Sequence, residues 1–329
     1  MEHLYRSPKY KGTTTSRGLK YHYYFSPAVS KKPTLLFVHG FPSFSAHWIN
    51  QITFFEKEGF GLVVPDMLGY GGSSIPKEPE AYVHALQAKD LIDIIDEEKL
   101  GSNVVAVGHD WGSVTVSRVA NLYQDRFLGF AFLSVGYLPP STETTYEELR
   151  NQWAAALGYV NIGYWEFFAS PEAADIMTRH TRAYNDLGWA QSTGMIKYNF
   201  CPVGGVQNFI ESESSTPRAT YLSKEDMITT EKLLARGGWS GPLSYYRNEI
   251  TDASREADKA IPAENYTIHK PVLFIGTAHD PIVVPALMEP LIQQFCTNSA
   301  TTTVEAAHWA FWEAPEQVNA QLYQWLKRL

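Results

Sequence analysis

Short apolar runs recur along the chain, and most of them end in glycine or in a polar residue. Runs of this length without polar interruption are typical of buried strands in a parallel sheet. The clearest runs cover residues 34–38, 62–64, 104–107, 130–133 and 271–275. A further strand is predicted at the edge of the sheet over residues 21–25, and a weaker one near residues 302–304.

Between these runs, apolar residues recur at helical spacing. Leu91 and Ile95 share one face of a helix that we predict over residues 82–97. A second helix is predicted over residues 111–123, and an amphipathic helix that includes Leu322 ends the chain. Strands that alternate with helices predict an α/β fold, in which a mostly parallel central sheet is flanked by helices.

The alternation stops near residue 137 and resumes near residue 251. The intervening residues are rich in Trp, Tyr and Phe, have helix-like segments and are interrupted by proline and glycine. We therefore predict an inserted helical lid over residues 137–250. The α/β core would then consist of residues 1–136 and residues 251–329.

Composition and charge narrow the class of protein. The 329 residues suit one α/β core with an insertion, and an apolar content of 44% is ample for a sizeable core. A formal charge of −8 and the lack of a basic run argue against a nucleic-acid partner. No segment suits a membrane span or a signal peptide, and Cys201 and Cys296 are expected to be free thiols. These features predict a cytoplasmic protein and leave its oligomeric state open.

The most informative motif is Gly-His-Asp-Trp-Gly at residues 108–112, which is centred on Asp110. It joins the apolar run 104–107 to the helix predicted from residue 111. Glycines two places before and after the central residue permit the sharp strand-to-helix turn called a nucleophile elbow, which lifts the central side chain clear of the sheet. The motif alone fits equally well a plain turn in which Asp110 caps the helix.

An aspartate at the elbow restricts the chemistry. Its carboxylate is ionised at neutral pH but is a weak nucleophile, so its substrate must bring strain or a good leaving group. Epoxides and alkyl halides meet this requirement, whereas ordinary esters and amides do not. Attack at carbon leaves an ester on Asp110, and water must cleave it with the help of a general base and an oxyanion hole.

The residues for this second step follow other strands. Asp280 lies just after the run 271–275, and His308 follows the last predicted strand. The order Asp110, Asp280, His308 matches the nucleophile–acid–histidine order of the α/β-hydrolases. We expect His308 to take a proton from water and Asp280 to orient the imidazole ring. His279 is the competing histidine and is predicted to be a loop residue.

The oxyanion hole needs two backbone N–H groups. Trp111, the residue after the nucleophile, is expected to provide one, and Phe41, in the loop after the strand 34–38, the other. Pro42 is predicted to follow a cis peptide bond that holds Phe41 in position. His39 is predicted to brace this loop by hydrogen bonds.

With these residues the chain resembles the α/β-hydrolase-fold soluble epoxide hydrolases. The resemblance spans nearly the whole core, and its motifs are residues 39–42, 66–73 and 108–112 together with Asp280 and His308. It implies the α/β-hydrolase fold and the conversion of a small-molecule epoxide to a vicinal diol. Neither a metal nor an organic cofactor is called for.

Members of that family use two lid tyrosines to hold the epoxide oxygen and to protonate the leaving alkoxide. Tyr164, four residues before a phenylalanine, and Tyr246, which precedes Arg-Asn, resemble these tyrosines. Ala169 stands where the first motif commonly has glutamine. Tyr159 and Tyr245 are the nearest alternatives. The aromatic lid also suggests apolar or aryl substrates.

Two other functions remain open at this point. Haloalkane and haloacetate dehalogenases use the same type of aspartate nucleophile, and the indole N–H of Trp111 could bind the halide. The tyrosine motifs favour the epoxide, because an alkoxide must be protonated and chloride need not be. A non-catalytic ligand receptor of the same fold is the third possibility.

Overall fold

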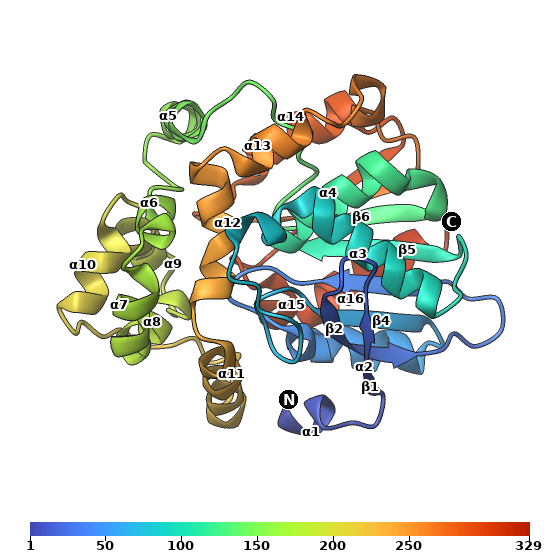
Figure 1. The fold of residues 1–329 in the computed structure, drawn as a ribbon, viewed down its shortest axis with the longest axis horizontal. Coiled ribbons are helices and arrows are strands. Elements are labelled where there is room, and N and C mark those ends of the chain that lie inside the picture. Colours follow the sequence, from blue (N-terminus) through green and yellow to red (C-terminus); the bar gives the residue numbers. More distant parts are fainter.

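The computed structural model describes residues 1–329, which form one eight-stranded sheet with helices on both faces (Figure 1). The strand order is β1-β2-β4-β3-β5-β6-β7-β8, in which only the pairs β1–β2 and β2–β4 are antiparallel. The strands are β1 (Tyr10–Thr14), β2 (Lys20–Ser26), β3 (Thr34–Val38), β4 (Gly61–Asp66), β5 (Val104–His109), β6 (Gly129–Leu133), β7 (Val272–Thr277) and β8 (Ser299–Val304). The predicted mostly parallel sheet is confirmed.

Both faces of the central strands are buried, which is why these strands are mostly apolar. Leu36 and Val38 of β3 pack in one apolar cluster with α3, α4 and α14, whereas Leu35 and Phe37 pack in another with α2 and α16. These core helices are α2 (Ile49–Lys57), α3 (His84–Glu97), α4 (Trp111–Tyr123), α14 (Pro285–Phe295) and α16 (Pro315–Leu326). Each sheet face is therefore covered by its own helical layer.

The prediction of an edge strand at residues 21–25 is wrong in one respect. These residues form β2, but β2 pairs with both β1 and β4 and is therefore interior. The true edge is β1, whose residues are mostly exposed. An exposed edge strand needs no apolar pattern, so β1 could not be recognised from hydrophobic residues.

A helical insertion separates β6 from β7. In Figure 1 its green and yellow helices gather to one side of the sheet, with α12 between them and the core. Its helices are α5 (Tyr146–Leu157), α6 (Tyr164–Ala169), α7 (Ala173–Arg179), α8 (Thr181–Gly188), α9 (Thr193–Met195), α10 (Gly205–Glu211), α11 (Lys224–Gly237), α12 (Ser240–Ile250) and α13 (Ala253–Asp258). The division of the chain after residues 136 and 250 stays a prediction.

The remaining helices are short, and they are α1 (Glu2–Tyr5) and α15 (Ala310–Glu313). Single turns of 3₁₀ helix lie at Ser45–Trp48, Pro79–Tyr82, Gln124–Arg126 and Ala263–Tyr266, and one turn of π helix at Ile196–Phe200. No helix combines the length and the apolar character that crossing a membrane requires.

The buried carboxylate of Asp66, at the end of β4, binds polar groups from four other segments of the chain. It accepts hydrogen bonds from the Tyr5 hydroxyl (2.7 Å), from the Ser45 N–H and hydroxyl (3.0 and 2.6 Å) and from the Gly72 N–H (3.0 Å). His22 Nδ1 lies 2.9 Å from it. Burial alone would raise the pKa of Asp66, but these partners outweigh burial and lower it.

We expect Asp66→Asn to destabilise the protein by about 2–4 kcal/mol, because an amide turns one acceptor oxygen into a donor that faces buried donors. Urea unfolding measures the change. Asp125→Asn is the control: the Asp125 side chain is 98% exposed, so a change of less than about 0.5 kcal/mol is expected there. Equal stability of the two variants would contradict the role given to Asp66.

Candidate active site

Asp110 occupies the turn between β5 and α4, with φ 54° and ψ −129°. Such a conformation costs on the order of 1–3 kcal/mol in a residue other than glycine and persists only when its surroundings enforce it. Those surroundings are close: a Cβ on Gly112 would lie 2.1 Å from the Val38 carbonyl oxygen, and one on Gly40 would lie 2.2 Å from Asp110 Oδ1. The glycines therefore let the backbones of β3 and α4 converge on the aspartate.

Two backbone N–H groups face this carboxylate. The Phe41 N–H donates to Asp110 Oδ1 at 2.7 Å, and the Trp111 N–H also favours the ionised form. The peptide bond between Phe41 and Pro42 is cis, as the sequence predicts. These are the two donors expected of an oxyanion hole.

His39 braces the loop that carries Phe41. The Met67 N–H donates to His39 Nε2 at 2.9 Å, so this nitrogen is unprotonated. Nδ1 then carries the proton and donates to the Gly40 carbonyl at 2.9 Å. Burial lowers the pKa of His39 to about 4, which keeps the ring neutral. The predicted structural role of His39 is confirmed.

The structure brings Asp280 and His308 to Asp110 although they lie far apart in the sequence. His308 Nδ1 is 2.8 Å from Asp280 Oδ2, and His308 Nε2 is 3.6 Å from Asp110 Oδ2. The Ile282 N–H holds the other oxygen of Asp280 at 2.8 Å. His279 is exposed and pairs with Glu305 at 3.0 Å. His308, not its competitor, therefore faces the carboxylate at the elbow.

Burial and neighbouring charges have opposite effects on the pKa values of His308 and Asp110. Burial alone would lower the pKa of His308, but the charge and hydrogen bond of Asp280 and the charge of Asp110 raise it to about 9. Burial raises the pKa of Asp110, and His308 with the two backbone N–H groups opposes that rise. With Asp110 ionised, the imidazole is protonated at neutral pH.

Three residues that the sequence reasoning missed fix the backbone of His308. The Glu313 carboxylate accepts the N–H groups on both sides of the histidine, from Ala307 at 2.8 Å and from Trp309 at 2.9 Å. His109 Nε2 and the Ser134 hydroxyl donate to the His308 carbonyl, at 2.8 and 3.1 Å. The only sequence signal was an acidic residue five places after the histidine. Its position in the sequence does not show that its carboxylate turns back to the N–H groups beside His308.

Tyr164 and Tyr246 lie in the wall of a cavity that Asp110 and His308 also line. Tyr164 comes from α6 and Tyr246 from α12, with ring centroids 5.8 Å apart. Burial raises the pKa of both phenols well above 10, so both keep their protons. Tyr184 lines the same cavity, and the sequence reasoning did not single it out.

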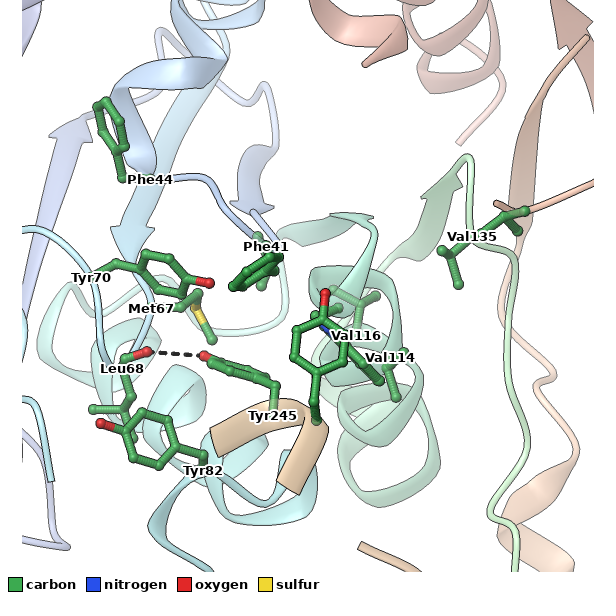
Figure 2. Packing of buried hydrophobic residues seen from close by; sticks show 14 of the residues in the cluster. Phe41, Phe44, Met67, Leu68, Tyr70, Tyr82, Val114, Val116, Val135 and Tyr245 are labelled. Carbon is green, nitrogen blue, oxygen red and sulfur yellow. Dashed lines mark hydrogen bonds between the residues drawn. The ribbon is translucent and has the colours of Figure 1, made fainter. Parts of the chain in front are cut away.

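The alternative tyrosines are engaged elsewhere. The Tyr245 hydroxyl lies 3.1 Å from the Leu68 carbonyl and 2.9 Å from Gln87 Oε1, so it points into the core (Figure 2). The Tyr159 hydroxyl donates to the Pro281 carbonyl at 2.8 Å. Neither lines the cavity at Asp110.

The charge of His308 predicts a pH effect on stability. Its pKa rises from 6.5 when unfolded to about 9 when folded, so its stabilising contribution is complete below pH 6.5 and is lost as pH rises to about 9. We expect the difference in unfolding free energy between the wild type and His308→Gln to shrink over this range. Urea unfolding at several pH values measures it, and a constant difference would contradict the raised pKa.

Comparison with known proteins agrees with this geometry. A family model described as the alpha/beta hydrolase fold matches residues 33–315. Epoxide hydrolase A of Mycobacterium tuberculosis is 30% identical over 90% of this chain and 91% of its own length, and an epoxide hydrolase of Neurospora crassa is 28% identical over 96% and 94%. The crystal structure of epoxide hydrolase A from Mycobacterium thermoresistibile superimposes with a TM-score of 0.81 at 28% identity, covering 98% of each chain. The chain therefore belongs to the α/β-hydrolase fold family and, within it, to the epoxide hydrolases.

Proposed function

We propose that the protein hydrolyses an epoxide to a vicinal diol through an ester formed on Asp110. The observation that carries this proposal is the meeting of four groups in one cavity: the elbow carboxylate, the imidazole of His308, and the phenols of Tyr164 and Tyr246. The first can attack carbon, the second can activate water, and the phenols can protonate an alkoxide.

In the first step a carboxylate oxygen attacks an epoxide carbon, and the bond from that carbon to the epoxide oxygen breaks. Asp110 Oδ1 is held by the Phe41 N–H, so Oδ2 is the free nucleophile. Tyr164 or Tyr246 gives its proton to the alkoxide, because a phenol that stays protonated at pH 7 is still acidic enough for this transfer. The products are a hydroxyalkyl ester and a tyrosinate.

In the second step water cleaves the ester. Esterification removes the negative charge of Asp110, so the pKa of His308 falls and the ring releases its proton to the tyrosinate through solvent. The neutral Nε2 then takes a proton from water, and the resulting hydroxide attacks Asp110 Cγ. The N–H groups of Phe41 and Trp111 stabilise the oxyanion. Its collapse expels the diol oxygen, which takes the proton from His308, and the carboxylic acid formed at Asp110 then gives its proton to His308, which restores the starting state.

The walls of the cavity favour an apolar or aryl substituent on the epoxide. Phe41, Ile196 and Phe200 contribute apolar surface beside Asp110. We propose that residues 137–250 act as a lid, because Tyr164 and Tyr246 both lie in this segment. Closure of such a lid would exclude bulk water from the ester.

Dehalogenation is the second candidate, since the buried indole N–H of Trp111, beside the Tyr246 phenol, makes no short hydrogen bond and could donate to a halide. The two phenols favour the epoxide, because chloride leaves without a proton. Assays of chloride release and diol formation on matched substrates separate the two reactions. Ligand binding without turnover of either substrate would support a non-catalytic receptor.

Replacing His308 by Gln should trap the intermediate, because attack by Asp110 remains and the base for the second step is lost. Intact-mass analysis after incubation with an epoxide should show a gain equal to the mass of the epoxide, located on the peptide of Asp110. Asp110→Asn is the control and should gain nothing. Diol formation by His308→Gln without any adduct would rule out the covalent route.

Exchanging both Tyr164 and Tyr246 for Phe should lower kcat for epoxide opening by about 10²–10⁴, the range of general-acid catalysis. Single exchanges should cost less, because one phenol remains. Tyr245→Phe is the matched control, since this hydroxyl lies outside the cavity, and it should keep most of the activity. Substantial turnover by the double variant would remove the phenols from the mechanism.

A further inference from the structure

A second cavity, which is open to solvent, meets the first at Asp110, Tyr164 and Ile282. It runs from the elbow along the first turns of α3 and α4, α13 and the loop 139–145. Under the proposed function, an epoxide at Asp110 that carries two substituents would place one in each cavity. The walls of the second cavity should therefore select one of these two arms.

His84, at the start of α3, presents an unused ring nitrogen in this wall. Its Nδ1 shares a hydrogen bond of 2.9 Å with the Thr115 hydroxyl, which also lies 3.2 Å from the Trp111 carbonyl. Nε2 is the ring nitrogen left for a ligand, and it is an acceptor when Nδ1 carries the proton. Burial lowers the pKa of His84 to about 3, so the ring stays neutral. His84 is 3% exposed, and its Nε2 has no hydrogen-bond partner.

Two further polar groups line the same cavity near the start of α13, which packs against α3. Ser254 is 7% exposed, and its hydroxyl lies beside the Glu249 carboxyl and favours the ionised form of that carboxyl, although it makes no short hydrogen bond. Burial outweighs this effect and raises the pKa of Glu249 to about 7. None of these three groups takes part in the proposed reaction. A buried polar group without a partner is expensive, so a ligand or water must satisfy His84 Nε2.

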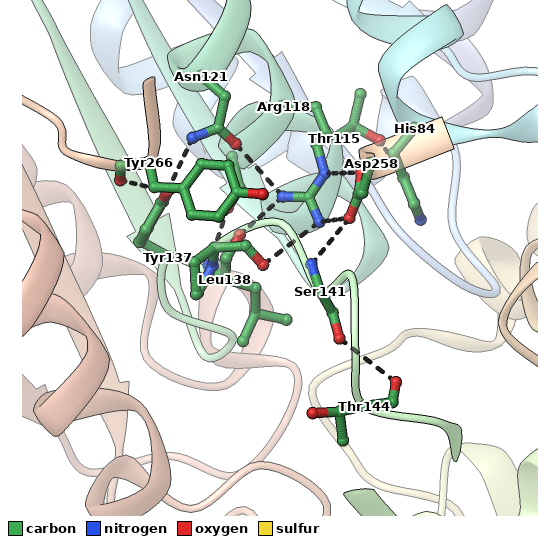
Figure 3. Close-up of polar contacts among 12 residues, drawn as sticks. His84, Thr115, Arg118, Asn121, Tyr137, Leu138, Ser141, Thr144, Asp258 and Tyr266 are labelled. Carbon is green, nitrogen blue, oxygen red and sulfur yellow. Dashed lines mark hydrogen bonds and ion pairs between the residues drawn. The ribbon is translucent and has the colours of Figure 1, made fainter. Parts of the chain in front are cut away.

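The charges around the cavity disfavour an anionic arm. Both arginines in its wall are already paired. Arg118 donates to both carboxylate oxygens of Asp258 at 2.7 and 2.6 Å and to the Leu138 carbonyl at 2.8 Å (Figure 3), and Arg255 pairs with Asp252. Glu249 has no cationic partner, so a carboxylate in the cavity would meet repulsion without a free positive charge.

We propose that the second cavity is a subsite for an uncharged, hydroxyl-bearing arm of the epoxide. The arm's hydroxyl group donates to His84 Nε2 or Glu249 and accepts from the Ser254 hydroxyl. A charged amine is less suitable, because it would lose its water of hydration among the apolar side chains that line the cavity, such as Val114 and Leu149. The substrate class is thus a disubstituted epoxide with a distal alcohol.

The test uses four sets of disubstituted epoxides that share one short arm. The other arm ends in methyl, hydroxyl, amine or carboxylate and is varied in length within each set. We expect kcat/KM of the best hydroxyl arm to exceed that of the methyl arm of equal length by about 5–10-fold, the value of one net hydrogen bond. The carboxylate arm should be the poorest. The proposal would be overturned if the hydroxyl arm were not preferred over the methyl arm at any length. A higher kcat/KM for an amine or carboxylate arm than for the hydroxyl arm would also overturn it.

Substitutions in the second cavity test whether its polar groups cause the preference for a hydroxyl arm. Ser254→Ala removes only the hydroxyl beside Glu249, and His84→Phe keeps a ring against Trp111 while it removes both nitrogens. Each should lower the hydroxyl-to-methyl ratio towards one. Gln191→Ala, which changes a polar residue of the first cavity, should leave this ratio unchanged. An unchanged ratio in both Ser254→Ala and His84→Phe would show that the preference arises elsewhere and would refute the subsite.

Failure of the subsite differs from failure of the proposed function. Turnover of the methyl arm without a hydroxyl preference refutes the subsite and leaves epoxide hydrolysis intact. Turnover of no epoxide refutes the proposed function, and calorimetry of the matched alcohols and alkanes then decides the subsite. Tighter binding of the alcohols that is lost in Ser254→Ala would still support it, and equal binding would refute it.

Discussion

The hydrogen bond from the Phe41 N–H to Asp110 is the constraint on which the rest of the site depends. At 2.7 Å it joins the loop after β3 to the turn after β5, and it does so at a residue held in an unfavourable backbone conformation. Because β3 and β5 are adjacent and parallel, both loops leave the sheet at the same edge. The donor is therefore in place before any ligand arrives, which is the meaning of preorganisation.

The second constraint is electrostatic, since Asp110, Asp280 and His308 are all buried within hydrogen-bonding or ion-pairing distance. Two carboxylates around one imidazole hold its proton, and removal of either charge weakens that hold. A reaction that neutralises one carboxylate thus changes the state of the histidine without any movement of the chain. The clamp of Glu313 on the neighbouring N–H groups suits this arrangement, because it fixes the ring position throughout.

The sequence predicted the parts of the fold that apolar burial determines and missed those that solvent-facing segments determine. The buried run of β5 and its glycines placed the elbow and α4 at the observed residues, but the exposed residues of β1 carried no comparable pattern. Asp280 and His308 could be predicted from the sequence because each follows a strand. The role of Glu313 and the second cavity could not be predicted, because they depend on how segments pack across the sheet and along α13.

The candidate site residues are divided between the α/β core and the helical insertion. Asp110, Asp280 and His308 stand on loops at one edge of the rigid sheet, whereas Tyr164 and Tyr246 stand on helices of the insertion. The proposed two-step reaction needs a fixed distance between the carboxylate and the imidazole, and loops on a rigid sheet can supply it. In that proposal the phenols contact only the oxygen that leaves carbon. The insertion also forms part of both cavity walls, so changes in it can alter the shape of the cavities while the residues at the sheet edge stay in place.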